Sequence, residues 1–212
     1  MSQTAQDPYG RGRRFAPARP YYPVRMLRKD VGVAIVVLLA LGLGLLLKLQ
    51  VETRTRVFQD KDSPFRMAYP ATWTSSGSLL DTLVKVEDPL ANSAFKTTLT
   101  VQSRELDTAS PVTLQTLVDR RVAQRGALTG YHFISNTSAT VGGVNSERIE
   151  YAYVTQPIDT PRRASLPVVV HANEYIVATK ERVYYITLAA PENEYARVKG
   201  RFDEVIRSVR LQ

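Results

Sequence analysis

The longest uninterrupted apolar stretch of the chain runs from Val31 to Leu47, VGVAIVVLLALGLGLLL. These seventeen residues contain no charge, proline or hydroxyl, and twelve of them are Leu, Ile or Val. As a helix they span about 26 Å, and Val51 extends the apolar surface past Lys48, whose ammonium reaches the interface along its own aliphatic stem. That length approaches the ~30 Å hydrocarbon core of a bilayer. We therefore predict a transmembrane helix over residues 31–51, with the lipid bilayer as a partner.

Two other interpretations of this stretch are weaker. A buried helix of a soluble domain rarely continues for seventeen residues without a polar position. A cleaved signal peptide has an apolar region of about 7–15 residues near its N-terminus, whereas thirty residues precede this one and no small-x-small cleavage signal follows it. Ala40 and Gly44, four residues apart, are small enough to seat a neighbouring helix. The residues assigned to the anchor are Val31, Val36, Leu39, Ala40, Gly44 and Leu47.

The charge distribution predicts the orientation of this helix. Residues 1–30 carry seven basic against two acidic residues, whereas residues 31–212 carry 21 basic against 18 acidic ones. Short basic flanks stay in the cytoplasm, so we expect a cytoplasmic N-terminus and an extracytoplasmic C-terminal domain, periplasmic or extracellular. Because the excess charge is local, no basic stripe on a folded face is indicated, and nucleic acid is not an expected partner.

The N-terminal segment of residues 1–30 mixes Arg, Pro, Gly and Tyr without periodicity, which predicts a disordered basic cytoplasmic tail. Its basic residues serve either as the topology signal alone or as a contact with anionic lipid. Tyr21 and Tyr22 are candidates for anchoring at the interface.

The remaining residues, 52–212, have the size of one domain with a core of its own. The chain has no cysteine, so no disulfide supports this domain. Alternating apolar and polar residues predict strands at 65–70, 79–86 and 95–102, a hairpin of 131–141 and 144–155 around Gly142-Gly143, and strands at about 167–178 and 182–189.

Two segments have helical periodicity instead. In the first, Leu114, Leu117, Val118 and Val122 share one face, with Asp119, Arg120 and Arg121 mostly on the other. The second begins after Pro191 and places Tyr195, Val198, Phe202, Val205, Ile206 and Val209 on one stripe. Consecutive strands with two helices packed on them indicate an α+β domain with a largely antiparallel sheet.

Two motifs of this domain resemble those of a known family. The segment Phe65-Arg-Met-Ala-Tyr-Pro-Ala-Thr-Trp73 is similar to the opening of PsbP-like domains. Near the end, Tyr184-Tyr-Ile-Thr-Leu-Ala-Ala-Pro191 and the following helix are also similar. The resemblance brackets residues 58–211, and the middle of the domain agrees by pattern more than by residue.

The resemblance implies a Mog1/PsbP-like α/β/α sandwich, in which helices flank an antiparallel sheet. The family contains an extrinsic subunit of the oxygen-evolving photosystem, a nuclear-transport factor that binds a small GTPase, and anchored bacterial proteins. It therefore implies a binding role and no particular reaction. The residues of the motifs are interpreted here as structural core: Tyr69, Pro70, Trp73, Tyr195 and Phe202.

Residues suited to catalysis are few. Cysteine nucleophiles and thiolate metal sites are excluded, and the sequence contains only two histidines, His132 and His171, for which the sequence offers no partner. No Gly-x-Ser-x-Gly elbow is present, and Gly142-Gly143 lacks the lysine and spacing of a phosphate loop. Pairs such as His171 with Glu174 are too small for a metal site. We expect no enzyme activity, no cofactor and no metal.

Two functional classes stay open on this evidence. The protein is either an accessory subunit that docks its outer domain on a larger membrane complex, an electron-transfer complex being one option, or a stand-alone anchored module that binds a small ligand or an envelope partner. A large exposed apolar patch favours the first class, and a closed apolar pocket with a few polar groups favours the second. We favour the first.

Overall fold

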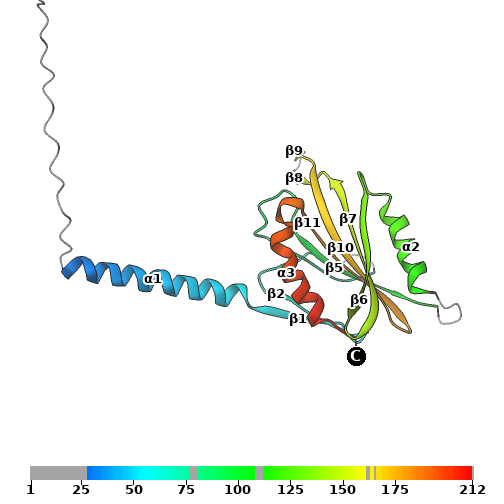
Figure 1. Cartoon of the computed structure of the whole chain (residues 1–212), viewed down its shortest axis with the longest axis horizontal. Coiled ribbons are helices and arrows are strands. Elements are labelled where there is room, and N and C mark those ends of the chain that lie inside the picture. Colours follow the sequence, from blue (N-terminus) through cyan, green and yellow to red (C-terminus); the bar gives the residue numbers. More distant parts are fainter. Residues whose placement is uncertain (1–27, 77–80, 108–111, 161–162, 165, 212) are drawn as a thin grey trace, which may run out of the picture. The chain divides into compact units, whose positions relative to one another are not determined.

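The computed structural model describes residues 28–76, 81–107, 112–160, 163–164 and 166–211 (Figure 1). The expectation of a disordered tail falls mainly on residues 1–27, which lie outside the described residues. The chain divides into two compact units, residues 1–45 and 46–212, and each is considered by itself below.

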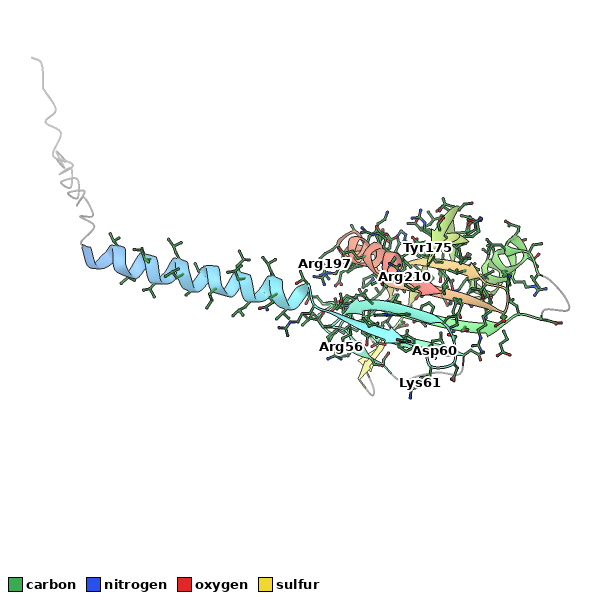
Figure 2. The ribbon with its side chains drawn as sticks, turned by 90° about the horizontal axis from the view of Figure 1, so that it is seen from below. Arg56, Asp60, Lys61, Tyr175, Arg197 and Arg210 are labelled. Carbon is green, nitrogen blue, oxygen red and sulfur yellow. The ribbon has the colours of Figure 1, made fainter. Side chains whose placement is uncertain are left out.

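The first element is helix α1, Arg28–Glu52. Its segment Val31–Val51 is long and apolar enough to cross a membrane, and no other helix in the described part of the chain has that character. The apolar side chains project from every side of the helix (Figure 2) and are solvent-exposed. Around Gly44 an added Cβ meets nothing within 4 Å. The helix therefore has a continuous, solvent-exposed apolar surface.

The second unit is an α+β domain. Its main sheet is antiparallel and has seven strands in the order β3-β4-β5-β11-β10-β7-β6. These strands are β3 (Thr74–Ser75), β4 (Thr82–Glu87), β5 (Thr98–Glu105), β6 (His132–Val141), β7 (Val144–Thr155), β10 (Val168–Ala178) and β11 (Arg182–Pro191). A three-stranded sheet joins β1 (Thr55–Gln59), β2 (Phe65–Pro70) and β12 (Arg210–Leu211), and β8 (Ile158–Thr160) pairs with β9 (Arg163–Ala164).

Two helices cover opposite faces of the main sheet, as Figure 1 shows. Helix α2 (Leu114–Arg125) packs on β7 and β10, and helix α3 (Glu192–Ser208) packs on β10, β11 and β2. Each helix has its own buried cluster of apolar side chains beneath it. The structure therefore confirms the predicted sandwich of an antiparallel sheet between helices.

The β6–β7 hairpin turns where the sequence predicted it. Gly142 and Gly143 have φ angles of 59° and 83°. Most residues with a Cβ adopt such positive φ angles only with strain. A Cβ at Gly142 would also lie 3.2 Å from the side chain of Leu211. The hairpin fixes the register of the outermost strand, His132–Val141.

Several predicted bounds were wrong. The strand expected from Phe95 begins at Thr98, because Lys96 and Thr97 are held in a loop: the Lys96 ammonium donates to the Ala91 carbonyl at 2.6 Å. Residues 77–80, the start of the strand expected at 79–86, lie outside the described residues. The strands β1, β3, β8, β9 and β12 were not predicted, because each has five residues or fewer and shows little periodicity of its own.

The motif residues surround the α3 side of the core. Trp73 and Phe202 are buried, as are Pro70 and Tyr195, whereas Tyr69 is only partly buried at the edge of the cluster. Tyr175, labelled in Figure 2, meets the ring of Phe202 edge-on at 5.8 Å between centroids. The ring of Phe202 thus packs helix α3 on strand β10 of the sheet.

Candidate functional site

A buried polar cluster lies between α2 and the sheet, and its centre is Glu174 on β10. Alternation along β10 turns Glu174 toward α2, together with the fully buried Ala172 and Ile176. The Glu174 carboxylate, with no exposed surface, accepts a hydrogen bond from Arg121 Nε at 2.7 Å. It also accepts from Arg125 Nε at 3.0 Å and from Arg125 Nη2 at 2.9 Å. One carboxylate therefore holds two guanidinium groups of the helix.

Two hydroxyl groups complete the surroundings of this carboxylate. Thr187 Oγ1 donates to Glu174 at 3.0 Å and the Tyr151 hydroxyl donates at 3.3 Å. Burial by itself raises the pKa of Glu174, but the attraction of Arg125 and Arg121 and their hydrogen bonds outweigh it, so the pKa is lowered. The carboxylate is ionised at neutral pH.

The cluster carries more positive than negative charge. The other two nitrogens of Arg121 donate to amide oxygens, those of Gln124 and Gln102, both at 2.7 Å. The Arg121 guanidinium also lies over the ring of Tyr185, 4.3 Å from its centroid. Two guanidiniums thus face a single carboxylate, which leaves one positive charge without a matching anion inside the cluster.

The expectation that Arg121 lies on the exposed face of its helix was wrong. Arg121 follows Val118 by three residues and therefore shares the apolar stripe of α2, where its side chain is 4% exposed. The sequence does contain an indication of this pair. Arg121 and Arg125 lie three and seven residues after Val118, on the apolar face of the helix, and Glu174 lies on a face of its strand that is otherwise apolar. Opposite charges on the otherwise apolar faces of a helix and a strand indicate a buried ion pair.

A cavity of about 170 Å³ opens beside this cluster, between the C-terminal end of α2 and the sheet. Its lining is rich in hydroxyl groups and includes the guanidinium of Arg125, which is 24% exposed. The lining residues are Thr98, Thr100, Gln102, Arg125, Leu128, Tyr151, Tyr153, Thr187 and Ala189. Burial raises the pKa of both tyrosines above the ordinary value of 10.0, so their hydroxyls keep their protons at neutral pH.

A second polar group lies on the α3 face of the sheet. The ring of His171 stacks on Tyr195 at 3.7 Å between centroids, and its two nitrogens lie 2.7 Å from Glu150 and 2.9 Å from Glu192. The Tyr195 hydroxyl lies within hydrogen-bonding distance of Asn173 as well. The expectation that His171 lacks partners was therefore wrong, since β7 and α3 bring both carboxylates to it.

His132 and the neighbouring acidic residues Glu87 and Asp88 lie outside both of these polar groups. His132 is exposed at the start of β6. Asp88 is buried in a turn, where it accepts from the Leu90 amide at 3.0 Å, and Glu87 pairs with Lys85. Among the described residues, no group of three or more His, Asp or Glu side chains is placed to hold a metal ion.

The outer strand β6 forms one edge of the main sheet and carries no charged residue and no proline in its ten positions. Most of it is exposed, and Phe133 and Ile134 are 41% and 44% exposed. Natural sheets usually protect a long edge with lysine, proline or a covering element. The charge-free edge of β6 is therefore an accessible surface for pairing.

Comparison with known proteins finds similarity in the fold and not in the sequence. The sequence matches no family model and no curated protein sequence. Among solved structures, the chain has a PsbP-like fold: it is similar to cyanobacterial PsbP from Synechocystis sp. PCC 6803, with 15% identity and a TM-score of 0.55 over 74% of this chain and 92% of that one. LpqN of Mycobacterium tuberculosis, described as involved in cell envelope biogenesis, is similar over 74% and 90% of the two chains, with 10% identity and a TM-score of 0.53.

Proposed function

We propose that the protein is a non-enzymatic, membrane-anchored accessory subunit. In this proposal residues 31–51 cross the bilayer with the N-terminus in the cytoplasm, and the 52–212 domain docks on a larger membrane complex on the other side. The PsbP-like fold supports a binding role, because the family that the sequence resembles contains an extrinsic subunit of the oxygen-evolving photosystem. An electron-transfer complex is accordingly the partner to test first.

The observation that carries the proposal is the accessible edge of β6. A strand of a partner that pairs with it would satisfy unpaired amide and carbonyl groups on both sides. The exposed Phe133 and Ile134 would add apolar contact next to that ladder. Because β6 has no charge of its own, it does not repel a partner strand, whereas lysine on an edge strand does so.

The alternative is a stand-alone anchored module that binds a small ligand or an envelope partner, and its small-ligand form has less support. The cavities of the described domain are open to solvent and lined in part by polar atoms. Sites for drug-sized ligands are clefts or cavities of about 300–1,000 Å³ with a mostly apolar lining. The cavity beside Arg125, of about 170 Å³, is smaller than this range. Two other cavities, of about 340 and 480 Å³, are large enough, but polar atoms make up more of their lining than apolar atoms do.

The connection between helix and domain also favours docking close to the bilayer. Helix α1 ends at Glu52 and β1 begins at Thr55, so only Thr53 and Arg54 join them. Two residues reach at most about 7 Å. A partner in the same membrane would therefore lie within reach of the domain.

The experiment is co-purification of the full chain from its native membrane in mild detergent, followed by mass spectrometry. The test variant is Ile134→Lys/Thr137→Lys in β6, and the matched control is Thr55→Lys/Gln59→Lys in β1, the edge of the small sheet. Wild type and the β1 variant should retain the partner, and the β6 variant should lose it while keeping its circular dichroism spectrum.

A second variant tests the helix. Ala40→Leu/Gly44→Leu adds bulk where a neighbouring helix would approach closely, and it should weaken co-purification while leaving membrane insertion unchanged. Retention of the same partner by both the β6 and the helix variants would contradict docking by these surfaces. Purification of wild type with no partner would favour the stand-alone module.

A further inference from the structure

The buried cluster under α2 has an excess positive charge beside an open cavity. Arg125 gives Nε and Nη2 to Glu174, and its Nη1 makes no hydrogen bond to any other described residue. Arg121 cannot supply the compensation, since its remaining nitrogens donate to Gln102 and Gln124. The Arg125 side chain is 24% exposed, so its guanidinium reaches the cavity while it remains paired with Glu174. The arrangement is therefore one that an anion in the cavity would complete.

We propose that this cavity binds the oxyanion group of a small ligand, a carboxylate or a phosphate, with Arg125 as its counter-charge. Hydroxyl groups from two strands are suited to the same role: Thr98 and Thr100 on β5, and Tyr153 on β7, all line the cavity. Hydroxyls donate to oxyanions as readily as they accept. The site does not depend on the edge of β6 and is separate from the proposed docking.

The size of the cavity limits the ligand. At about 170 Å³ it lies well below the range of drug-sized sites. It accommodates one oxyanion group and little else, so a larger ligand would extend past Leu128 toward solvent. Ala189 on β11 lines the cavity and has no side chain beyond Cβ.

The electrostatic surroundings favour an anion over a cation. Glu174 is the carboxylate that acts most strongly on Arg125 among the described residues, and its own charge is held by two arginines. Burial raises the pKa of both Tyr151 and Tyr153, so both stay neutral; the Tyr151 hydroxyl donates to Glu174, and the Tyr153 hydroxyl is the one that can donate to an anion. A cation in this cavity would meet a guanidinium group with no free carboxylate.

The test is isothermal titration calorimetry of the full chain in detergent with sodium phosphate and, separately, sodium acetate, at constant ionic strength. Wild type should show saturable binding of one of the two probes in the millimolar range or tighter. Arg125→Gln should weaken that binding by about tenfold or more, the effect of losing one charge-assisted hydrogen bond. Arg207→Gln, an exposed arginine of α3 on the other face of the sheet, is the control and should bind like wild type.

A second variant keeps the test informative if Arg125→Gln fails to fold. Thr98→Val/Thr100→Val removes two hydroxyls of the cavity with almost no change of shape and leaves the Arg125–Glu174 pair intact. It should also weaken binding of the probe while the melting temperature without the probe stays close to that of wild type. Absence of saturable binding of both probes to wild type, or equal binding by wild type and the threonine variant, would overturn the proposal. The stronger of phosphate and acetate identifies the type of oxyanion.

Discussion

Arg121 on α2 and Glu174 on β10, separated by 53 positions in the sequence, form an ion pair in which both side chains are almost fully removed from solvent. The shortest distance between their charged atoms, from Arg121 Nη2 to Glu174 Oε1, is 2.5 Å. This pair fixes the helix over the sheet at a defined position. An apolar contact of the same area would hold the helix less specifically, because it lacks directional hydrogen bonds.

Removal of the Glu174 charge should destabilise the domain strongly. Glu174→Gln leaves two guanidinium groups facing each other without a carboxylate, and breaking a buried pair in this way costs about 3–5 kcal/mol. The measurement is urea denaturation of the full chain in detergent, followed by circular dichroism. The matched control is Glu105→Gln, which breaks the exposed pair with Arg182 and should cost at most about 1 kcal/mol. Equal effects of the two variants would contradict a central role of the buried cluster.

Acid should destabilise the domain through the same residue. The pKa of Glu174 is lower in the folded protein than its ordinary value of 4.5. The unfolded chain therefore takes up a proton on this residue before the folded chain does, and stability falls as the pH drops below about 4.5 and on through the lower folded pKa. Above that range the contribution is complete. The free energy of unfolding, measured between neutral pH and pH 3, should fall more steeply in wild type than in Glu174→Gln; parallel slopes would contradict the lowered pKa.

Phe202 should carry a large share of the packing of α3. The side chain is 1% exposed and touches Tyr175 in the core below the helix. Phe202→Ala should cost about 3–5 kcal/mol through lost burial and the cavity it leaves. Glu204→Ala, an exposed position on the same helix, is the control and should change stability by at most about 0.5 kcal/mol. An unchanged melting temperature for Phe202→Ala would show that the helix does not depend on this contact.

The two histidines should behave differently when replaced by alanine. His171→Ala removes a stacked ring and two polar contacts with Glu150 and Glu192, and should cost about 1–3 kcal/mol. His132→Ala should be nearly neutral because His132 is exposed. Both variants, once folded, should retain the co-purifying partner, because pairing along β6 uses backbone groups that His132→Ala leaves in place, and His171 lies on the α3 face of the sheet. A folded His171 variant that loses a biological activity would move the protein into the enzyme class.

The proposed topology predicts the pattern of proteolysis. Protease added to intact cells or spheroplasts should remove the 52–212 domain and spare residues 1–30, because the basic flank is expected on the cytoplasmic side. An epitope on each end of the chain, detected by immunoblotting, reports the result. Protection of the C-terminal epitope would reverse the orientation, and a mature N-terminus beyond residue 45 would show that the helix is a cleaved signal.

The sequence by itself determined the local elements of this protein. Each of these elements shows in the sequence as a pattern of neighbouring residues, which requires no knowledge of the rest of the fold. The patterns are the apolar run from Val31, the alternation along β6, β7, β10 and β11, and the apolar stripe of α3. Gly142 and Gly143 placed the hairpin because the turn requires positive φ. The motifs around Trp73 and Pro191 indicated the PsbP-like fold.

Only the tertiary structure decided which polar residues meet. Arg121 joins Glu174, and His171 joins Glu150 and Glu192. These residues lie on the four elements α2, β10, β7 and α3, and their spacing along the chain does not give the distances between them. A charged residue on a helix is predicted to face water, because burial of an unpaired charge is costly. In the folded domain the Glu174 carboxylate of β10 lies next to Arg121 and offsets that cost, so Arg121 is buried. The cavity beside Arg125 follows from the same packing, because it is formed by side chains from α2, β5, β7 and β11 that no local pattern brings together.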